Sequence, residues 1–176
     1  MEWMFMPLKR YADFSGRSRR MEFWMWIVLQ VIVYFVFWVL LFAVGGSAIM
    51  MGANNPTAAL AGGGAIMIIG LLYMVYGLAV LVPHLAVAVR RLHDTNRSGW
   101  WILAPMVPYL GVFLAGALVA SSPDLAGVAG ILMMVCGLAA LGLVILLIVF
   151  YFMEGTKGPN KYGPDPKGQD TGQVFA

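Results

Sequence analysis

The sequence predicts an all-α membrane protein with four transmembrane helices and both termini in the cytoplasm. Of its 176 residues, 61% are hydrophobic and only 11% are charged, whereas about 25% are charged in soluble globular domains. The mean hydropathy is +0.84, and four long apolar runs approach or exceed the roughly 20 residues that cross a bilayer. Because backbone groups in hydrocarbon must bond within their own segment, each run is expected to be a helix.

The expected spans cover residues 23–44, 65–89, 101–120 and 128–153. A basic segment, residues 1–22, precedes the first span, but that span is much longer than the apolar part of a signal peptide, which has about 7 to 15 residues. It is therefore expected to remain as an anchor. Residues 154–176 are rich in Gly, Pro and Lys, which favours an exposed, weakly ordered tail.

The distribution of cations predicts the orientation. All eleven Lys and Arg residues lie before the first span, between the second and third, or after the fourth. The connections at 45–64 and 121–127 contain none, as the positive-inside rule requires of translocated loops. Both termini are therefore expected on the cytoplasmic side. Trp24, Trp26, Trp100 and Trp101 are expected near the same interface.

Small residues four positions apart, such as Gly111 with Ala115 and Cys136 with Ala140, favour close packing of the second to fourth helices. The first helix carries only bulky side chains over residues 21–42 and is expected nearer the lipid. The alternative is that small residues are simply common in membrane helices. Within the second span, Pro83 lacks a backbone donor and is expected to bend the helix or to free the carbonyl of Ala79.

Three polar strings end these spans: SGRSRRMEFW at 15–24, RRLHDTNRSGWW at 90–101 and EGTKGPNKYGPDP at 154–166. In this order and between apolar spans, they resemble the bacterial inner-membrane family catalogued as domain of unknown function 805, the YhaH-like proteins. The resemblance covers most of the chain. It implies a multipass protein of the bacterial inner membrane and offers no established reaction, substrate or catalytic residue to transfer.

The strings supply the candidate site residues. Six arginines could together bind lipid phosphates or a protein partner: Arg17, Arg19, Arg20, Arg90, Arg91 and Arg97. The alternative is that they set the orientation and pair with the acids Glu22, Asp94 and Glu154. A structural polar cap is expected to include Glu22, His93, Asp94, Trp100 and Trp101.

His84 is the only ionisable side chain inside an expected span. Such groups can serve proton relays or solute paths. A single histidine without a buried acid or base makes a poor relay, so the favoured role is a neutral imidazole bonded to a carbonyl that Pro83 frees.

Catalytic and metal sites are not favoured. His93, Asp94 and Ser98 are close in sequence, but no nucleophile elbow accompanies them. His84 and His93 would point to opposite sides of a helix, and one cysteine excludes a four-cysteine metal site. No cofactor is expected, and no nucleic-acid partner, because the basic residues lie on short loops without a recognisable binding module.

The leading hypothesis is a non-enzymatic membrane protein whose cytoplasmic arginine-rich cap binds anionic lipid or a protein partner. The alternative is a small oligomeric transporter or channel that uses Pro83 and His84. A third hypothesis is an enzyme acting on lipid or polyprenyl phosphates, with His93 and Asp94 as its acid–base groups. The expected partners are the bilayer and a second copy or another membrane protein.

Overall fold

The computed structural model describes residues 2–52 and 55–168. Within them the chain forms five α-helices and two short 3-10 helices, and no strand is assigned there. The elements are α1 (Glu2–Lys9), α2 (Arg20–Gly52), α3 (Pro56–Asp94), η1 (Gly99–Leu103), α4 (Met106–Ser121), η2 (Pro123–Leu125) and α5 (Ala126–Phe152). Four helical segments are long and apolar enough to cross a membrane, so the all-helical prediction with four spans is confirmed. The end of the expected tail, residues 169–176, lies outside the described residues.

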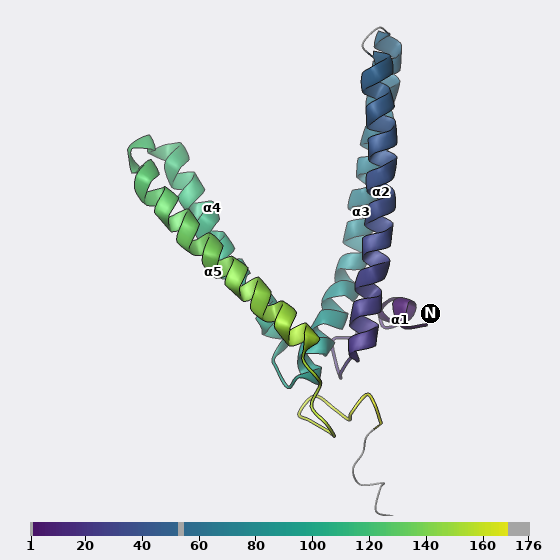
Figure 1. Cartoon of the computed structure of the whole chain (residues 1–176), viewed down its shortest axis with the longest axis vertical. Helices are drawn as coiled ribbons and strands as arrows, with labels where there is room; N and C mark the ends of the chain where they lie inside the picture. The colour runs from purple at the N-terminus through teal and green to yellow at the C-terminus, as the bar shows by residue number, and fades with distance from the viewer. Residues whose placement is uncertain (1, 53–54, 169–176) are drawn as a thin grey trace, which may run out of the picture. The chain divides into compact units, whose positions relative to one another are not determined.

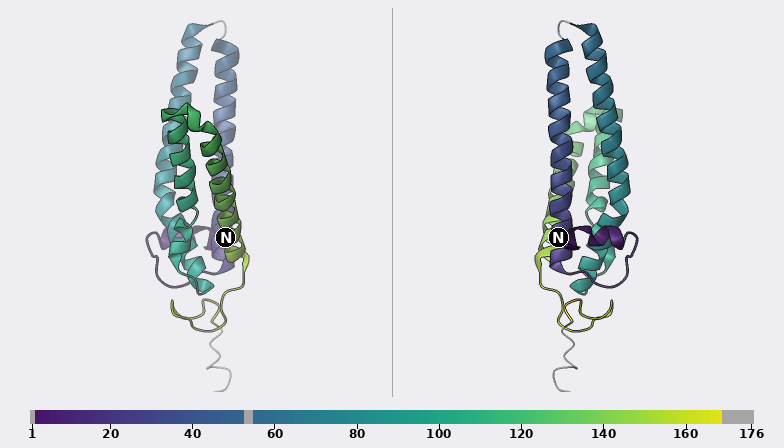
Figure 2. Two further views of the ribbon diagram at one scale, coloured as in Figure 1. Left: turned by 90° about the vertical axis from the view of Figure 1, so that its left-hand side faces the viewer. Right: turned by 90° about the vertical axis from the view of Figure 1, so that its right-hand side faces the viewer.

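The contacts divide the chain into two units. The first comprises Met1–Asp13 and Met21–Val87, and the second comprises Phe14–Arg20 and Ala88–Ala176. In the first unit, α2 and α3 run side by side as a hairpin, with α1 beside the start of α2 (Figures 1 and 2). In the second unit, α4 and α5 form another hairpin.

Both helices of the first hairpin are longer than the expected spans. At about 1.5 Å per residue, the 33 residues of α2 and the 39 of α3 reach about 50 and 58 Å, beyond the roughly 30 Å of hydrocarbon. Most of the connection expected at 45–64 is helical. This stretch is rich in glycine, which is typical of a loop. In the structure one of these glycines, Gly62, lets α3 approach α2 closely, because a Cβ at this position would collide with Ala48.

The first hairpin places its polar side chains between its own helices. Trp26 Nε1 donates to His84 Nδ1 at 3.3 Å, and the Tyr76 hydroxyl donates to Gln30 Oε1 at 2.8 Å. Further along the hairpin, the ring of Tyr34 lies 5.5 Å from that of Tyr73. The first membrane helix therefore packs along the second through large side chains, and its expected position nearer the lipid stays a prediction.

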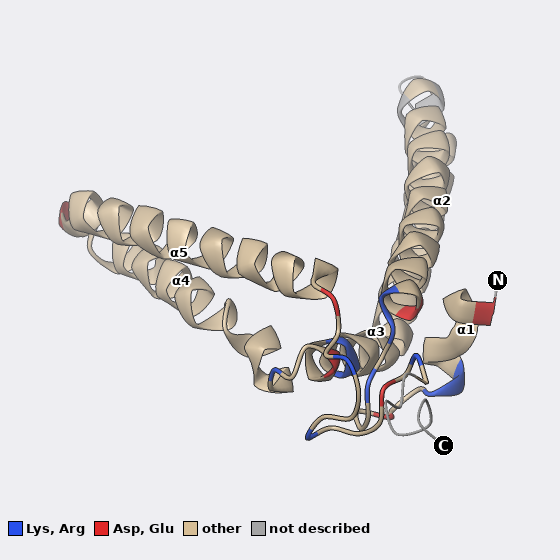
Figure 3. Ribbon diagram, turned by 60° about the horizontal axis from the view of Figure 1, so that its bottom comes forward, with Lys and Arg blue, Asp and Glu red and all other residues tan. Residues whose placement is uncertain are grey.

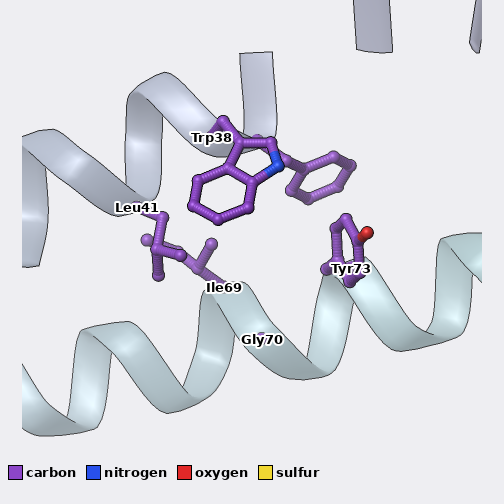
Figure 4. Close-up of a pocket in the computed structure, with 6 residues that line it drawn as sticks. Trp38, Leu41, Ile69, Gly70 and Tyr73 are labelled. Carbon is purple, nitrogen blue, oxygen red and sulfur yellow. The ribbon is translucent and has the colours of Figure 1, made fainter. Parts of the chain in front are cut away.

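The hairpin also contains an apolar cavity of about 170 Å³ between α2 and α3 (Figure 4). Trp38 and Leu41 approach it from α2, and Ile69 and Tyr73 from α3. Gly70 lies between the two α3 side chains, and its missing side chain leaves open space. The cavity is lined almost entirely by carbon, so it fits apolar groups only.

Pro83 lies inside α3, which continues through it without interruption. The carbonyl that the proline leaves without its helical donor is that of Ala79. The Tyr11 hydroxyl, just after α1, donates to this oxygen. The predicted free carbonyl is therefore present, but Tyr11 takes it and His84 does not. The sequence did not predict α1, because eight residues that include Pro7 make a weak helix by themselves.

The prolines that follow α3 shape the start of the third span. Ser98 accepts a hydrogen bond from the Trp100 amide and caps η1. Pro105 then precedes α4, and Pro108 lies in its first turn, where a missing amide hydrogen costs no helical bond. The expected irregularity near Pro105 and Pro108 is thus a 3-10 helix followed by a new helix start.

Small residues allow α4 and α5 to pack closely. Ala115, Ala129 and Ala140 are buried. A Cβ built on Gly111 would lie 2.7 Å from Cys136 Sγ and 3.5 Å from its Cβ. The predicted role of small residues in the later helices is therefore observed in this hairpin.

This approach predicts a specific cross-link. In a Gly111→Cys variant the two Cβ atoms would be about 3.5 Å apart, within the disulfide range of about 3.5–4.5 Å. Mild oxidation should join the new cysteine to Cys136 within one chain. The loss of both free thiols, measured by alkylation and mass spectrometry, would report the bond.

Gly116→Cys on the same helix is the matched control, because its nearest neighbour on α5 is Met133 and not Cys136. Equal cross-linking of the two variants would contradict the observed register of α4 and α5.

Candidate cap site

We define the cap as residues 14–20, 90–98 and 154–168, all of which belong to the second unit. The cap contains nine Lys and Arg residues and three carboxylates. Figure 3 shows these charges gathered where α3 and α5 end, whereas the turn between α4 and α5 carries only an acidic residue, Asp124. The three polar strings of the sequence thus meet in the cap.

Asp94 is the centre of the cap. Its side chain is 6% exposed and accepts from Arg17 Nε at 2.9 Å and from Arg91 Nη1. Its backbone carbonyl accepts from the amide of Thr156 at 2.9 Å and from the Thr156 hydroxyl at 3.2 Å. Asp94, at the end of α3, therefore binds the N-terminal segment through Arg17, α3 itself through Arg91, and the tail through Thr156.

Arg17 ties the tail to the N-terminal segment. Its side chain is 1% exposed. Beyond Asp94, its Nη1 donates to the Gly158 carbonyl at 2.6 Å and its Nη2 to the Thr156 carbonyl at 2.5 Å. Gly158 has a φ of +75°, in the left-handed region that glycine adopts without strain. The planar guanidinium thus uses its several donors to hold a tight turn of the tail.

Arg91 caps the end of α5. Its side chain is fully buried, and it donates to the carbonyls of Tyr151, at 3.1 Å, and Met153. Arg20 donates to the neighbouring Phe152 carbonyl at 3.3 Å. The last carbonyls of a helix have no partner within the helix, and a cation there also opposes the negative end of the helix dipole. These two arginines explain why α5 ends at Phe152.

The tail packs on α3 without space for extra atoms. A Cβ on Gly155 would collide with the Asp94 carboxylate, so only glycine fits there. Asn160 donates to the His93 carbonyl at 3.0 Å, and the Tyr162 ring stacks on His93 at 3.8 Å. The sequence expectation of a weakly ordered tail is wrong as far as Gly168, because these contacts order it.

Asp165 closes a second turn of the tail. Its carboxylate accepts from the amides of Gly158, at 3.1 Å, and Lys167, at 2.8 Å. Burial alone would raise the pKa of Asp165, but these hydrogen bonds and the charges of Arg17 and Lys167 outweigh it and lower the pKa. The carboxylate therefore stays ionised at neutral pH.

The six candidate arginines fall into two groups. Arg17, Arg90 and Arg91 are buried, whereas Arg19, Arg20 and Arg97 are partly exposed. Arg19 Nε donates to the Pro166 carbonyl, and Arg20 pairs with Glu154 at 2.6 Å. Arg97 lies 3.8 Å above the ring of Phe150, which belongs to an apolar cluster with Leu92.

The expected structural polar cap stays a prediction. Its members His93, Asp94, Trp100 and Trp101 belong to the second unit, and Glu22 is buried in the first turn of α2, in the first unit. Trp100 is 78% exposed and Trp101 39%. Trp26, which is expected near the interface, is fully buried and donates to His84.

The groups considered for catalysis have other partners. His93 Nδ1 donates to the Gly16 carbonyl at 3.2 Å, Asp94 binds the two arginines, and Ser98 caps η1. His84 accepts from an indole that can only donate, so its Nδ1 carries no proton and the imidazole is neutral. No group of three His, Cys, Asp or Glu able to hold a metal occurs in residues 2–52 and 55–168.

Sequence reasoning did not identify the roles of Tyr11, Gly155, Thr156, Asn160 and Asp165. The last four lie in the third polar string, and its density of glycine and short polar side chains was the available signal. Thr156 and Asn160 bind Asp94 and His93, which lie more than 60 residues away in the sequence. No local pattern encodes such pairings.

The Asp94 contacts predict that Arg91→Ala destabilises the cap. The change leaves a buried carboxylate with one partner fewer and exposes the end of α5, for which we expect a cost of about 3–5 kcal/mol. In detergent, the tail should become sensitive to trypsin at Lys157 and Lys161, as measured by mass spectrometry of the fragments.

Arg20→Ala is the matched control, because its ion pair with Glu154 is 38% and 70% exposed and such pairs contribute about 0–1 kcal/mol. Equal protection of the tail in Arg91→Ala and in the unsubstituted protein would show that the buried pair does not hold it.

The comparisons with known proteins agree with this architecture. The family model described as a protein of unknown function, DUF805, matches residues 11–164, which include the first two polar strings and all but the last two residues of the third. The inner membrane protein YhaH of Escherichia coli (strain K12) is 34% identical over 95% of this chain and 98% of its own. The inner membrane protein YhaI of that strain is 33% identical over 95% and 97%, and its uncharacterized protein YiiR is 31% identical over 93% and 88%.

No solved structure matches the chain. The two relatives named as inner membrane proteins and the four apolar helices confirm the predicted multipass inner-membrane protein. Since the family model covers most of its length, the chain belongs to the DUF805 family.

Proposed function

We propose that this inner-membrane protein presents its cap to the cytoplasm and there binds the anionic phospholipids of the inner leaflet. The observation that carries the proposal is a surplus of exposed cations. The three carboxylates of the cap are each paired: Asp94 with two buried arginines, Glu154 with Arg20, and Asp165 with backbone amides. Lys157, Lys161 and Lys167 are exposed beside them.

In this proposal the candidate arginines have different tasks. Arg17, Arg90 and Arg91 hold the cap together from within, as their burial favours. Arg19, Arg20 and Arg97, with the three lysines, meet the lipid head groups. Each cation near an anionic surface contributes about 1 kcal/mol, so several acting together would enrich anionic lipid around the cap.

The aromatic residues support the same placement. Trp100 and Trp101 follow the cap on η1 and expose much of their rings. An indole prefers the boundary between acyl chains and head groups, where its ring is apolar and its N–H has partners. A cap carried at that boundary would hold its lysines level with lipid phosphates.

A protein partner is the main rival occupant of the cap, and transport is a separate alternative. A transport role for Pro83 and His84 has less support, because the Ala79 carbonyl and the His84 ring each have a partner within the first unit. The proposal therefore rests on the cap.

The proposed orientation predicts which side of the membrane exposes the tail. In inverted membrane vesicles, trypsin should release a C-terminal epitope tag by cutting after Lys167, which is exposed at the end of the ordered tail, whereas in intact spheroplasts the tag should remain. The positive-inside rule is the reason, because every cation of the chain lies in a segment assigned to the cytoplasm.

Asp124→Lys supplies the matched control, since it puts a cleavable residue in the exposed turn before α5. It should be cut only in spheroplasts. Release of the tag from intact spheroplasts would reverse the proposed orientation.

The lipid proposal predicts the composition of lipid retained by the protein. In nanodiscs extracted directly from membranes, mass spectrometry should find phosphatidylglycerol and cardiolipin enriched over the bulk membrane. Replacing Lys157, Lys161 and Lys167 together by alanine should reduce this enrichment by about an order of magnitude or more, because three surface charges are lost.

The corresponding triple lysine-to-arginine variant keeps the charge and should keep the enrichment. If the alanine variant retains the same lipids, the lipid proposal fails. Loss of a specific protein instead of lipid from the alanine variant would assign the cap to a protein partner.

A further inference from the structure

The cap encloses a polar cavity that the lipid-surface proposal does not require. Its volume is about 210 Å³, and all of its lining belongs to the second unit. Four cations contribute to it, Arg17, Arg19, Lys157 and Lys167, together with Asp94, Glu154 and Asp165. The segments that meet there are the N-terminal segment, the end of α3 and the tail.

The charge available inside this cavity is positive. Its acids already have partners: Asp94 pairs with Arg17, which lines the cavity, and with Arg91, which does not, and Glu154 pairs with Arg20. Asp165 accepts from two backbone amides. By contrast, the ammonium groups of Lys157 and Lys167 make no hydrogen bond or ion pair among the described residues, although the charge of Lys167 also acts on Asp165. A ligand therefore meets two ammonium groups without such bonds and carboxylates that already have partners, which favours an anion over a cation.

The size and chemistry of the cavity fit a tetrahedral oxyanion. A water molecule occupies about 30 Å³ in the liquid, so a volume of 210 Å³ admits a phosphate group together with some of its water. Polar groups dominate the lining, which does not suit an acyl chain. Lysine binds phosphate as a compact point charge, and arginine adds directed donors from its planar fork.

We propose that the cavity is a specific site for a phosphate group, carried either by a lipid head group or by a free phosphate. Lys157 and Lys167 provide the mobile charges, and the fixed Arg17 contributes a positive field from the cavity wall. The inference deepens the proposed function where the phosphate belongs to a lipid. It differs from that function in requiring one saturable site formed by particular lysines, and not merely a positive surface.

The test uses the purified full chain in a non-ionic detergent. Inorganic phosphate and dihexanoyl phosphatidic acid are titrated separately, and binding is measured by isothermal titration calorimetry. We expect a single saturable site for at least one of the two. The double variant Lys157→Ala, Lys167→Ala should weaken it by about tenfold or more per lysine, because charge-assisted hydrogen bonds are lost.

Lys9→Ala is the control. Lys9 is an exposed lysine at the end of α1, lies outside the cap and does not line the cavity. It should leave the affinity within about twofold of the unsubstituted protein. Limited trypsin digestion of the double variant should show that the cap remains folded, since neither lysine side chain holds it together.

The outcomes separate the sources and the two proposals. Binding of phosphatidic acid alone identifies a lipid phosphate, and binding of inorganic phosphate identifies a phosphate that need not be attached to lipid; both support the site if Lys157 and Lys167 are required. Absence of binding for both probes overturns it, as does an equal loss in Lys9→Ala, which would leave only general surface charge. Lipid enrichment in nanodiscs can persist in that last case, so failure of the cavity inference is distinguishable from failure of the proposed function.

Discussion

The cap depends on one buried carboxylate. Asp94 lies between the guanidinium groups of Arg17 and Arg91, and it is the only acid among these three charges. A carboxylate removed from water is costly unless it is paired and fully hydrogen-bonded. Two arginines satisfy the Asp94 oxygens, and in turn the remaining donors of both arginines bind backbone carbonyls.

The hydrogen bonds from Arg17 and Arg91 to these backbone carbonyls determine much of the surrounding structure. Because Arg91 occupies the carbonyls at the end of α5, that helix ends where the tail can turn back over α3. The tail then passes so close to Asp94 that residue 155 must be glycine. Arg17 holds the next turn of the tail, at Gly158. The end of α5, the glycine at position 155 and the turn at Gly158 thus all follow from the burial of one acid.

In the first unit, too, polar groups removed from water need hydrogen-bond partners, but here the groups are neutral. Three polar groups of this unit have a partner within it: Trp26 donates to His84, Tyr76 donates to Gln30, and Tyr11 donates to the carbonyl that Pro83 leaves free. Lipid cannot supply hydrogen bonds, so internal pairs are favoured. His84 is accordingly a structural acceptor in this hairpin, and the proline is accommodated by a side chain from outside α3.

Composition and charge were sufficient to predict the four helices, because span length and the distribution of cations are properties of short sequence windows. The site was predicted less fully. The sequence placed Arg17, Arg91 and Asp94 in the cap but could not show that the arginines are buried, since burial depends on the return of the tail. Neither α1 nor the helical part of residues 45–64 was predicted, because Pro7 and the glycines are tolerated there by tertiary contacts that propensity does not contain.

Because the buried arginines order the tail, they also fix the positions of its lysines. Lys157 and Lys167 lie on either side of the turns that Arg17 and Asp165 hold, at Gly158 and at the Lys167 amide. Cations on a disordered tail would lose conformational freedom when they bind, whereas a turn that is already ordered loses less. The buried ion pairs therefore favour a defined binding site over a diffuse basic tail. In the proposed site the buried arginines would act mainly by holding the turns in place, and the exposed lysines are the residues whose removal would separate recognition from folding.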